Sequence, residues 1–413
     1  MQEKQANIAV VVVAYNREVA LERILNSLAI ANYDGFANIP LIISIDKSET
    51  DAIEKIAKSF NWLFGKKKII VHNENLGLKN HIISCGDLTS TYENVIVLED
   101  DLYVSPYFYD YAYQAREFYK NDENVAGISL YSIDCNDHAV LPFIPIADGF
   151  DNFFMQVPSS LGQMWTKKQW HEFKKFYDSD NVTITHEDII PDKVIAWGES
   201  SWKKYFYKYL VNFNKFFVYP RVSFTTNFGD PGTHFILETK RFQVNICMNT
   251  RTYNFSRLSE ALAQYDCFHE LMPEIIKKMN PQLGEYDFTC DLYGEKNLGK
   301  INNEFIISIR DCNSPLKSFS CGMIPQELNI ALAIDGDYFS LGKTIHFNKQ
   351  FDQIHPKRLK LTTFSKISTF IIRHKAYNDA EKNFKNSISY KVSRLILFPL
   401  LILKKLKIVL MSK

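Results

Sequence analysis

The stretch VIVLEDDLYVSP, residues 95–106, decides the fold of this chain. Its four leading apolar residues indicate a short buried strand, and three consecutive acids, Glu99, Asp100 and Asp101, follow that strand directly. Like charges repel each other, and partial burial raises the free energy of every ionised carboxylate further. A chain that keeps three acids here is expected either to leave them solvated in a turn or to hold a cation beside them.

The residues around this stretch alternate between strand and helix patterns. Amphipathic segments separate short apolar runs that are rich in β-branched residues. The expected strands of the first hundred residues are 8–14, 41–46, 68–72 and 94–98. Continuous apolar strands that alternate with amphipathic helices are typical of a mostly parallel sheet with helices on both faces, so the sequence predicts an α/β fold.

Helix-start signals accompany two of the expected helices. Ser48 or Thr50 is available to cap the helix that follows the second strand. Ser105 and Pro106 suit the cap and first position of the helix after the acidic stretch.

Polar side chains follow three of the expected strands at the point where each strand ends. Arg17 follows the first strand, Asp46 the second, and the three acids the fourth. In open α/β sheets, ligands bind beyond the carboxyl ends of the strands, so these residues are expected to meet at one crevice. Mn²⁺ or Mg²⁺ held by one or two carboxylates together with substrate phosphates would compensate the acidic charge.

The pattern changes after about residue 250, where a helical stretch over 257–279 leads into several short β-like segments. One of these segments contains Asp335 and Gly336, which predict a hairpin turn. The expected domains are an α/β domain over 1–250, a helix plus β-rich accessory domain over 251–355, and a basic tail over 356–413.

The tail differs from the rest of the chain in charge. The formal net charge of the whole chain is only +1, yet residues 355–413 carry fourteen Lys or Arg and two acids. Its apolar run over 395–403 is too short to span a bilayer. We expect a basic amphipathic helix lying on an anionic membrane surface, with a core-docked terminal helix as the alternative.

Cysteine usage and the N-terminus indicate a cellular location. The seven cysteines include no C-x-x-C pair, which argues for a reducing compartment and against a disulfide framework or a zinc site. The N-terminus lacks the pattern of a signal peptide. The expected location is cytoplasmic and peripheral on the inner face of the cell membrane, and no nucleic-acid partner is expected.

Four stretches, AVVVVAYNR, IISID, VIVLEDDLYVSPYFYDY and SSLGQMW, resemble nucleotide-sugar glycosyltransferases of the GT-A fold. The similarity is to the N-acetylglucosaminyltransferase I group and to bacterial family 2-like glycosyltransferases, and it covers about residues 7–240. The EDDL-x-V-x-P-x-F pattern is far more specific than a bare D-x-D. The resemblance leaves the β-rich part and the tail unexplained.

The resemblance implies roles for the residues at the strand ends. Asp101 would bind the metal, and Glu99 and Asp100 would face the sugar and ribose of the donor. Asp46 would hydrogen-bond the uracil edge, and Arg17 would lie near the base or the diphosphate.

Three further donor-site residues follow from the same resemblance. Lys79 or His81, in NLGLKNH, would line the nucleotide pocket. His234, in NFGDPGTHF, would donate to the leaving phosphate or complete the metal shell. For the two histidines a purely structural role is the alternative.

On the acceptor side, Gly162 would let the backbone approach the sugar, and Trp165 would offer a stacking face. The alternative for Trp165 is a core position. The general base of an inverting transfer would be Glu199, in AWGESSW, where the family's segment has the pattern W-D-x-x-W. This chain departs from that pattern in residue type and spacing, so Glu187 and Asp188 remain fallback bases.

The expected function is an inverting, metal-dependent transfer of a hexosyl or N-acetylhexosaminyl group from a UDP-sugar donor to a saccharide acceptor. The tail points to a lipid-linked acceptor in bacterial surface polysaccharide synthesis. A sugar-1-phosphate nucleotidylyltransferase is one alternative, although AYNREVAL lacks the Gly-rich loop of those enzymes. A non-catalytic sugar-binding or scaffold protein is the other.

Overall fold

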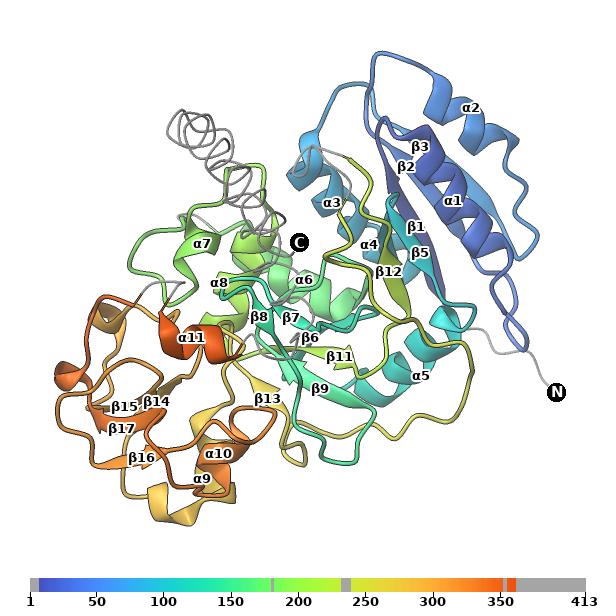
Figure 1. Ribbon diagram of the computed structural model, residues 1–413. Coiled ribbons are helices and arrows are strands. Elements are labelled where there is room, and N and C mark those ends of the chain that lie inside the picture. The colour runs from blue at the N-terminus through green and yellow to red at the C-terminus, as the bar shows by residue number, and fades with distance from the viewer. Residues whose placement is uncertain (1–6, 180–181, 232–238, 352–354, 362–413) are drawn as a thin grey trace, which may run out of the picture. The chain divides into compact units, whose positions relative to one another are not determined.

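The structure of the protein is a computed structural model that describes residues 7–179, 182–231, 239–351 and 355–361. Among these residues, nine strands form the central sheet (Figure 1). Their spatial order is β13 (Gln264–Tyr265), β9 (Asn152–Met155), β11 (Phe216–Pro220), β6 (Val125–Ser129), β10 (Gln163–Thr166), β4 (Asn94–Glu99), β1 (Ile8–Ala14), β2 (Leu41–Ile45) and β3 (Lys67–Val71). Strands β4, β1, β2 and β3 are mutually parallel, and β10 runs antiparallel beside β4. The predicted mostly parallel α/β sheet is confirmed.

Strand register brings the predicted strand ends to one edge of this sheet. Every residue of β1 is buried, as expected for a central strand flanked by two parallel neighbours. Val13 of β1 aligns with Ser44 of β2 and with Glu99 of β4. The segments that follow β1, β2 and β4 therefore leave the sheet at the same edge, which positions the candidate site.

Helices pack on both faces of the sheet (Figure 1). One face packs against α1 (Glu18–Ala29), α2 (Ala52–Ser59) and α5 (Phe108–Tyr119), which share a buried apolar cluster with β1 and β2. The other face packs against α3 (Gly77–Asp87), which continues into α4 (Thr89–Tyr92), and against α6 (Lys167–Tyr177) and α8 (Lys203–Asn212). On that face Trp165 of β10 packs against Trp170 of α6 and Phe206 of α8.

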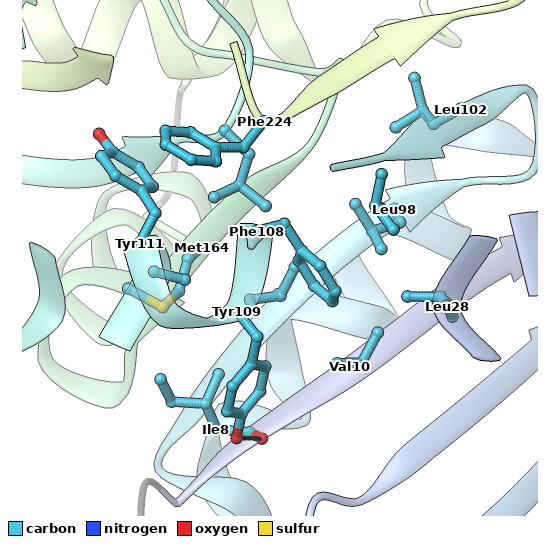
Figure 2. Packing of buried hydrophobic residues seen from close by; sticks show 14 of the residues in the cluster. Ile8, Val10, Leu28, Leu98, Leu102, Phe108, Tyr109, Tyr111, Met164 and Phe224 are labelled. Atoms are coloured by element: carbon cyan, nitrogen blue, oxygen red, sulfur yellow. Dashed lines mark hydrogen bonds between the residues drawn. The ribbon is translucent and has the colours of Figure 1, made fainter. Parts of the chain in front are cut away.

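Aromatic side chains of α5 fill much of the first face (Figure 2). The Tyr109 hydroxyl donates a 2.9 Å hydrogen bond to the Ile8 carbonyl, at the start of β1. Tyr111 stacks on Phe224 with ring centroids 4.2 Å apart. These contacts join the helix after the acidic stretch to the first strand and to a segment more than a hundred residues later. The high aromatic content is therefore used in the core to a large extent.

Both predicted helix caps are wrong. The helix α2 begins after Asp51, and the Ser48 hydroxyl instead donates to the Thr50 carbonyl. The helix α5 begins at Phe108 with Tyr107 as its N-cap residue, so Ser105 lies two residues before the cap position. Its hydroxyl accepts from the Tyr107 amide and donates to the Cys247 carbonyl. Tertiary hydrogen bonding displaced the local signal in this case.

A smaller ladder stands beside the acidic stretch. Strand β5 (Leu102–Val104) directly follows the acids and pairs antiparallel with β12 (Thr225–Asn227). The Phe228 amide then donates to the Asp101 carbonyl at 2.9 Å. The pairing of the next residues and this hydrogen bond hold the backbone of Asp101 in place. A second short pair joins β7 (Cys135–Asn136) to β8 (Leu141–Pro142).

The predicted β-rich part is present as a separate sheet. Its order is β14 (Phe288–Asp291), β15 (Phe305–Ser308), β17 (Phe339–Lys343) and β16 (Lys317–Phe319), with the helices α9 (Pro273–Met279) and α10 (Leu328–Ala331) beside it. The predicted hairpin at Asp335 and Gly336 is wrong. The residues before the turn form α10, and β17 pairs with β16 instead.

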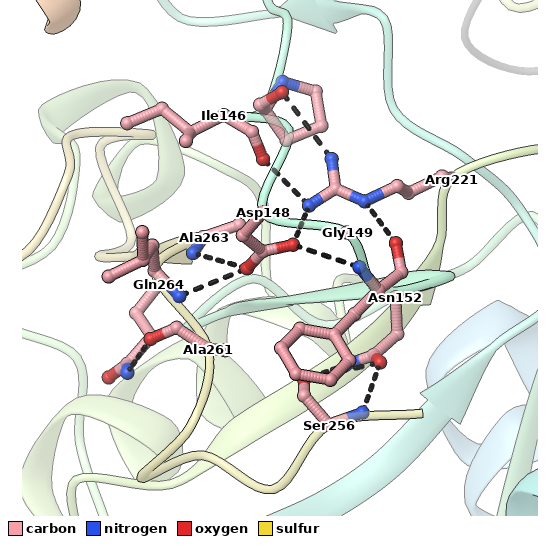
Figure 3. Close-up of polar contacts among 12 residues, drawn as sticks. Ile146, Asp148, Gly149, Asn152, Arg221, Ser256, Ala261, Ala263 and Gln264 are labelled. Carbon is pink, nitrogen blue, oxygen red and sulfur yellow. Dashed lines mark hydrogen bonds and ion pairs between the residues drawn. The ribbon is translucent and has the colours of Figure 1, made fainter. Parts of the chain in front are cut away.

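The expected helix over residues 257–279 is also mostly wrong, because only α9 is helical there. The reason is a buried polar network (Figure 3). The Asp148 carboxylate accepts from the amides of Leu262 and Ala263 at 3.0 and 3.1 Å, and Arg221 pairs with it at 2.6 Å. Backbone amides bound to a carboxylate are unavailable for a helix, so the chain stays extended and adds β13 to the sheet.

The described residues up to 351 form one compact unit, and residues 355–361 belong to a second unit that contains α11 (Pro356–Leu361). The predicted domain boundaries at 250 and 355 stay predictions. The membrane-seeking part of the tail lies outside the described residues. Within the part of the chain that the structure describes, no helix is long and apolar enough to cross a membrane. The short α7 (Asp192–Ile195) lies in the segment that leads to Glu199.

Candidate active site

The three acids occupy different environments at the carboxyl end of β4. Glu99 is the last residue of the strand and is half-buried. Asp100 is buried, with 2% of its surface exposed. The side chain of Asp101 is 17% exposed. Of the three, Asp101 and Glu99 therefore retain access to solvent.

Arg17 lies against two of these acids. Its Nη1 donates to Asp101 Oδ2 at 2.9 Å, and its Nη2 donates to Asp100 Oδ1. Burial lowers the pKa of Arg17, but the two carboxylates together raise that pKa above its usual value. One guanidinium thus bridges two neighbouring carboxylates, and the cation that the acidic stretch required is partly supplied by the chain itself.

The pKa values of Glu99 and Asp100 are strongly shifted from their usual range. Burial raises the pKa of Glu99 to about 8, repulsion from Asp101 and Asp100 adds to the rise, and Arg17 and Lys203 oppose it. Burial likewise raises the pKa of Asp100 to about 6, against the opposing attraction of Arg17. Keeping these carboxylates ionised therefore costs free energy, and an added cation would lower that cost.

These residues could supply only part of the coordination shell of a divalent cation. A carboxylate on a fixed strand end is a suitable hard ligand, and Asp101 meets that description. Among the described residues, no three His, Cys, Asp or Glu side chains are grouped to hold a metal ion. Any cation here would thus depend on oxygen atoms of a bound substrate as well as on Asp101.

Asp46 is placed at the end of β2 as predicted, but its carboxylate already serves the fold. It accepts backbone hydrogen bonds from Lys47 at 2.9 Å, Leu76 at 2.8 Å and Gly77 at 3.1 Å. These bonds tie the end of β2 to the start of α3. A contact between Asp46 and a nucleobase stays a prediction, and the residue has this second, structural role.

His81 has the buried position expected of its structural alternative, and a role in the nucleotide pocket stays a prediction. It is 2% exposed on α3, and its Nε2 lies 2.8 Å from the Ser44 hydroxyl. Burial lowers the pKa of His81 to about 4, which makes it a neutral core residue. Lys79 lies on the same helix and is half-buried, with its Nζ 5.5 Å from the centre of the Tyr205 ring.

None of the surface of Trp165 is exposed, which is the core position given as the alternative to its stacking role. Gly162 has φ +98°, and a Cβ there would lie 2.8 Å from Thr225 Cγ2. The chain's own packing therefore requires glycine at this position. A close approach of the Gly162 backbone to a sugar stays a prediction.

Glu199 lies on the surface, with 81% of its side chain exposed. Lys204 Nζ donates to it at 2.6 Å and the Tyr205 hydroxyl donates at 2.9 Å. These bonds lower the pKa of Glu199, as does the nearby charge of Lys79. Glu199 and Lys79 thus meet around Tyr205, between α3 and α8.

The two fallback bases differ in availability. Asp188 pairs with Lys208 at 2.7 Å and accepts from the Thr185 amide at 2.7 Å. Glu187 is exposed. His234, predicted for the phosphate or the metal, lies outside the described residues. The preceding loop is anchored to α1, where Arg23 pairs with Asp230 and lies 3.9 Å from the centre of the Phe228 ring.

Sequence reasoning missed Lys203, the first residue of α8. Its charge lowers the pKa of Glu99, while burial lowers the pKa of Lys203 itself, with Asp137 and Glu99 opposing. Its Nζ also lies 5.7 Å from the centre of the Trp197 ring. The adjacent pair Lys203 and Lys204 is visible in the sequence, but only the fold decides which lysine acts on Glu99 and which pairs with Glu199.

Comparison with known proteins supports the sequence resemblance. Residues 9–187 match the family described as Glycosyl transferase family 2. This match agrees with the resemblance to glycosyltransferases that the sequence showed over the same part of the chain. No curated protein matches the chain.

Several solved structures are similar to part of this chain, at low identity and with low TM-scores. S. aureus TarS 1–349 in complex with UDP-GlcNAc is 15% identical, with 57% of this chain and 60% of that chain covered and a TM-score of 0.36. GalNAc-T7 with UDP, GalNAc and Mn²⁺ is 13% identical over 52% and 42%, with a TM-score of 0.37. The Pyrobaculum calidifontis mannosyltransferase with GDP-Man and Mn²⁺ is 10% identical over 42% and 48%, with a TM-score of 0.29. This chain thus spans less than two thirds of each of them.

Proposed function

Residues 9–187 carry the pattern of glycosyl transferase family 2, and from that premise we propose that the protein transfers a sugar from a nucleotide-sugar donor to a saccharide acceptor. We propose further that the donor is a UDP-sugar, that the reaction inverts the anomeric centre, and that it depends on Mn²⁺ or Mg²⁺. The transferred group is a hexosyl or N-acetylhexosaminyl group.

The observation that carries the proposal is the position of the acidic triplet. Glu99, Asp100 and Asp101 lie where β4 leaves a parallel sheet, at the edge shared with the ends of β1 and β2. That edge is where open α/β sheets bind ligands. The perturbed pKa values of Glu99 and Asp100 are a further property of functional sites.

In this proposal each residue has a separate role. Asp101 is the protein ligand of the divalent cation, which when bound stabilises negative charge on the departing diphosphate. Arg17 is within reach of the same diphosphate. Glu199 accepts the proton of the attacking acceptor hydroxyl, and its bonds to Lys204 and Tyr205 keep it ionised and oriented.

A screen for nucleotide release tests the activity. We expect the purified protein with Mn²⁺ to release UDP from at least one common UDP-sugar, and Asp101→Asn to lower that release at least a hundredfold. GDP-mannose serves as the comparison donor, and release of GDP alone would contradict the choice of UDP. If no donor is cleaved and Asp101→Asn leaves nucleotide binding unchanged, the protein is a binding or scaffold protein instead.

The acceptor is proposed to be a saccharide linked to a lipid, in bacterial surface polysaccharide synthesis. The support is the basic, apolar composition of residues 356–413, which suits an anionic membrane surface at the inner face of the cell membrane. Flotation with liposomes containing anionic lipid tests this part. The full chain is expected to float, and a chain ending at Ser387 is expected to stay in the dense fraction. Equal flotation of the two would contradict a membrane role for the apolar end of the tail.

A further inference from the structure

Arg17 occupies the place where the proposed metal site needs a cation. Its guanidinium contacts one carboxylate oxygen of Asp101 at 2.9 Å and one of Asp100. Within the described residues these two carboxylates are its side-chain partners. A divalent ion on Asp101 would stand within a few ångströms of that guanidinium, and like charges at such a distance repel.

The backbone around Arg17 is held in place while its side chain is long. The Arg17 carbonyl accepts from the Leu21 amide at 3.0 Å, in the first turn of α1. The side chain itself is 27% exposed. Its end can therefore leave the carboxylates by changes of side-chain torsions alone, without movement of β1 or α1.

The oxygen atoms of a bound diphosphate would be alternative partners for both the Arg17 guanidinium and the divalent ion. Guanidinium groups form strong paired hydrogen bonds with phosphate oxygens, and divalent ions of this type bind through a carboxylate together with substrate phosphates. In the empty site Arg17 is shared by Asp100 and Asp101, whereas the occupied site would have enough anionic oxygens for both Arg17 and a divalent cation.

We propose that Arg17 is a placeholder for the metal: it neutralises Asp100 and Asp101 in the empty protein and moves to the diphosphate when metal and nucleotide bind together. The inference rests on the proposed function. It requires positive coupling, in which UDP raises the affinity for Mn²⁺ and Mn²⁺ raises the affinity for UDP by the same factor. Couplings of this kind are typically about 5–150-fold.

The test measures Mn²⁺ binding directly, by the loss of the free-ion electron paramagnetic resonance signal, with and without UDP. In the natural protein, Mn²⁺ is expected to bind at least tenfold more tightly with UDP than without it. In Arg17→Gln, binding of Mn²⁺ alone is expected to tighten by about tenfold, because the competing cation is gone. The coupling to UDP is expected to shrink by a similar factor.

Two further variants keep the test decisive. Arg257→Gln removes an arginine that pairs with Asp122 at 3.3 Å, remote from the triplet, and should change neither affinity. Arg17→Lys keeps the charge but loses the bridge, so its affinity for Mn²⁺ alone should fall between those of the natural protein and Arg17→Gln. It also serves if Arg17→Gln, which leaves Asp100 buried and unpaired, does not fold.

The outcomes separate this inference from the proposed function. Equal Mn²⁺ affinity of the natural protein and both Arg17 variants, without UDP, overturns the placeholder role even if the enzyme is active. Tighter Mn²⁺ binding by the variants, together with no cleavage of any nucleotide-sugar, leaves the placeholder role standing and removes the glycosyltransferase proposal.

Discussion

At the scale of single residues, the three acids that look equivalent in the sequence have separate roles in the structure. Asp100 is buried against Arg17, Glu99 ends its strand with a raised pKa, and Asp101 is the most suited to a ligand. Their difference comes from their positions, with Glu99 at the end of β4 and the two aspartates in the turn after it, and from Arg17, which follows a different strand. The chemistry of the three acids therefore depends on Arg17 as well as on the acids themselves.

Glu199 allows a direct test at the same scale. Glu199→Gln is expected to lower sugar transfer by about 10²–10⁴-fold, the usual contribution of a general base, while UDP binding is unchanged. Because Lys204 and Tyr205 lower the pKa of Glu199, its ionisation should not limit the rate at mildly acidic pH. The measurement is the rate of transfer against pH. Glu187→Gln is the matched control, and a larger loss there would identify Glu187 as the base.

At the scale of elements, loops from distant parts of the chain hold the site rigidly. The turn before β10 passes so close to β12 that position 162 has no room for a side chain. Strand β12 in turn pairs with β5, directly after the acids. Gly162, for which the resemblance implied an acceptor role, therefore also belongs to the packing around Asp101, the proposed metal ligand.

Gly162→Ala tests this packing. The variant combines a positive φ with a Cβ 2.8 Å from Thr225, so we expect a loss of about 1–3 kcal/mol in the free energy of unfolding. Chemical denaturation measures it. Thr225→Ser in the same background removes the clashing methyl group and should restore part of the loss. Gly198→Ala, where nothing lies closer than 3.8 Å, should change little.

At the scale of the whole molecule, buried polar groups join the central sheet to the segments that follow it. Asp148 holds the chain before β13, and the Tyr265 hydroxyl of β13 donates to Glu327 at 3.0 Å, directly before α10. The β-rich sheet is thus attached to the central sheet through hydrogen bonds as well as apolar contacts. Neither the Asp148 hydrogen bonds nor the bond between Tyr265 and Glu327 can be recognised from residues close together in the sequence.

Asp148→Ala is expected to lower the free energy of unfolding by about 3–5 kcal/mol, because Arg221 and two amides lose a buried partner. Thermal or denaturant unfolding gives the value. Asp178→Ala, which removes a surface pair with Lys174, should lower it by less than about 1 kcal/mol. Similar losses in the two variants would show that the network in Figure 3 contributes little.

Glu327 predicts a dependence of stability on pH. Burial raises the pKa of Glu327 to about 7, above its value in the unfolded chain. The stability it contributes is therefore fully present below about pH 4.5 and is lost as pH rises through 7. Glu327→Gln should be less stable than, or equal to, the natural protein at pH 5 and gain relative to it at pH 8. Melting temperatures across this range measure the trend, and Glu304→Gln, at an exposed site, should follow the natural protein.

Much of the fold was predictable because it depends on local patterns. The four strands before the acids were located to within one residue, since runs of buried β-branched residues have few other stable conformations. The edge at which Arg17, Asp46 and the acids gather followed from parallel topology alone. The long helix after residue 257 and the cap at Ser105 failed, because Asp148 and Cys247 supply hydrogen bonds across the chain. The cap at Ser48 failed because its hydroxyl donates to the Thr50 carbonyl instead.

By itself, the sequence determined the class of fold, the edge of the sheet where chemistry is expected, and the identity of the acids there. Only the tertiary structure decided that Arg17 neutralises two of those acids, that His81 and Trp165 are core residues, and that the charge of Lys203 acts on Glu99. The physical reason is the distance along the chain over which the deciding interactions act. Strand and helix patterns arise from neighbours within a few residues, whereas burial and charge depend on groups that lie anywhere along the chain.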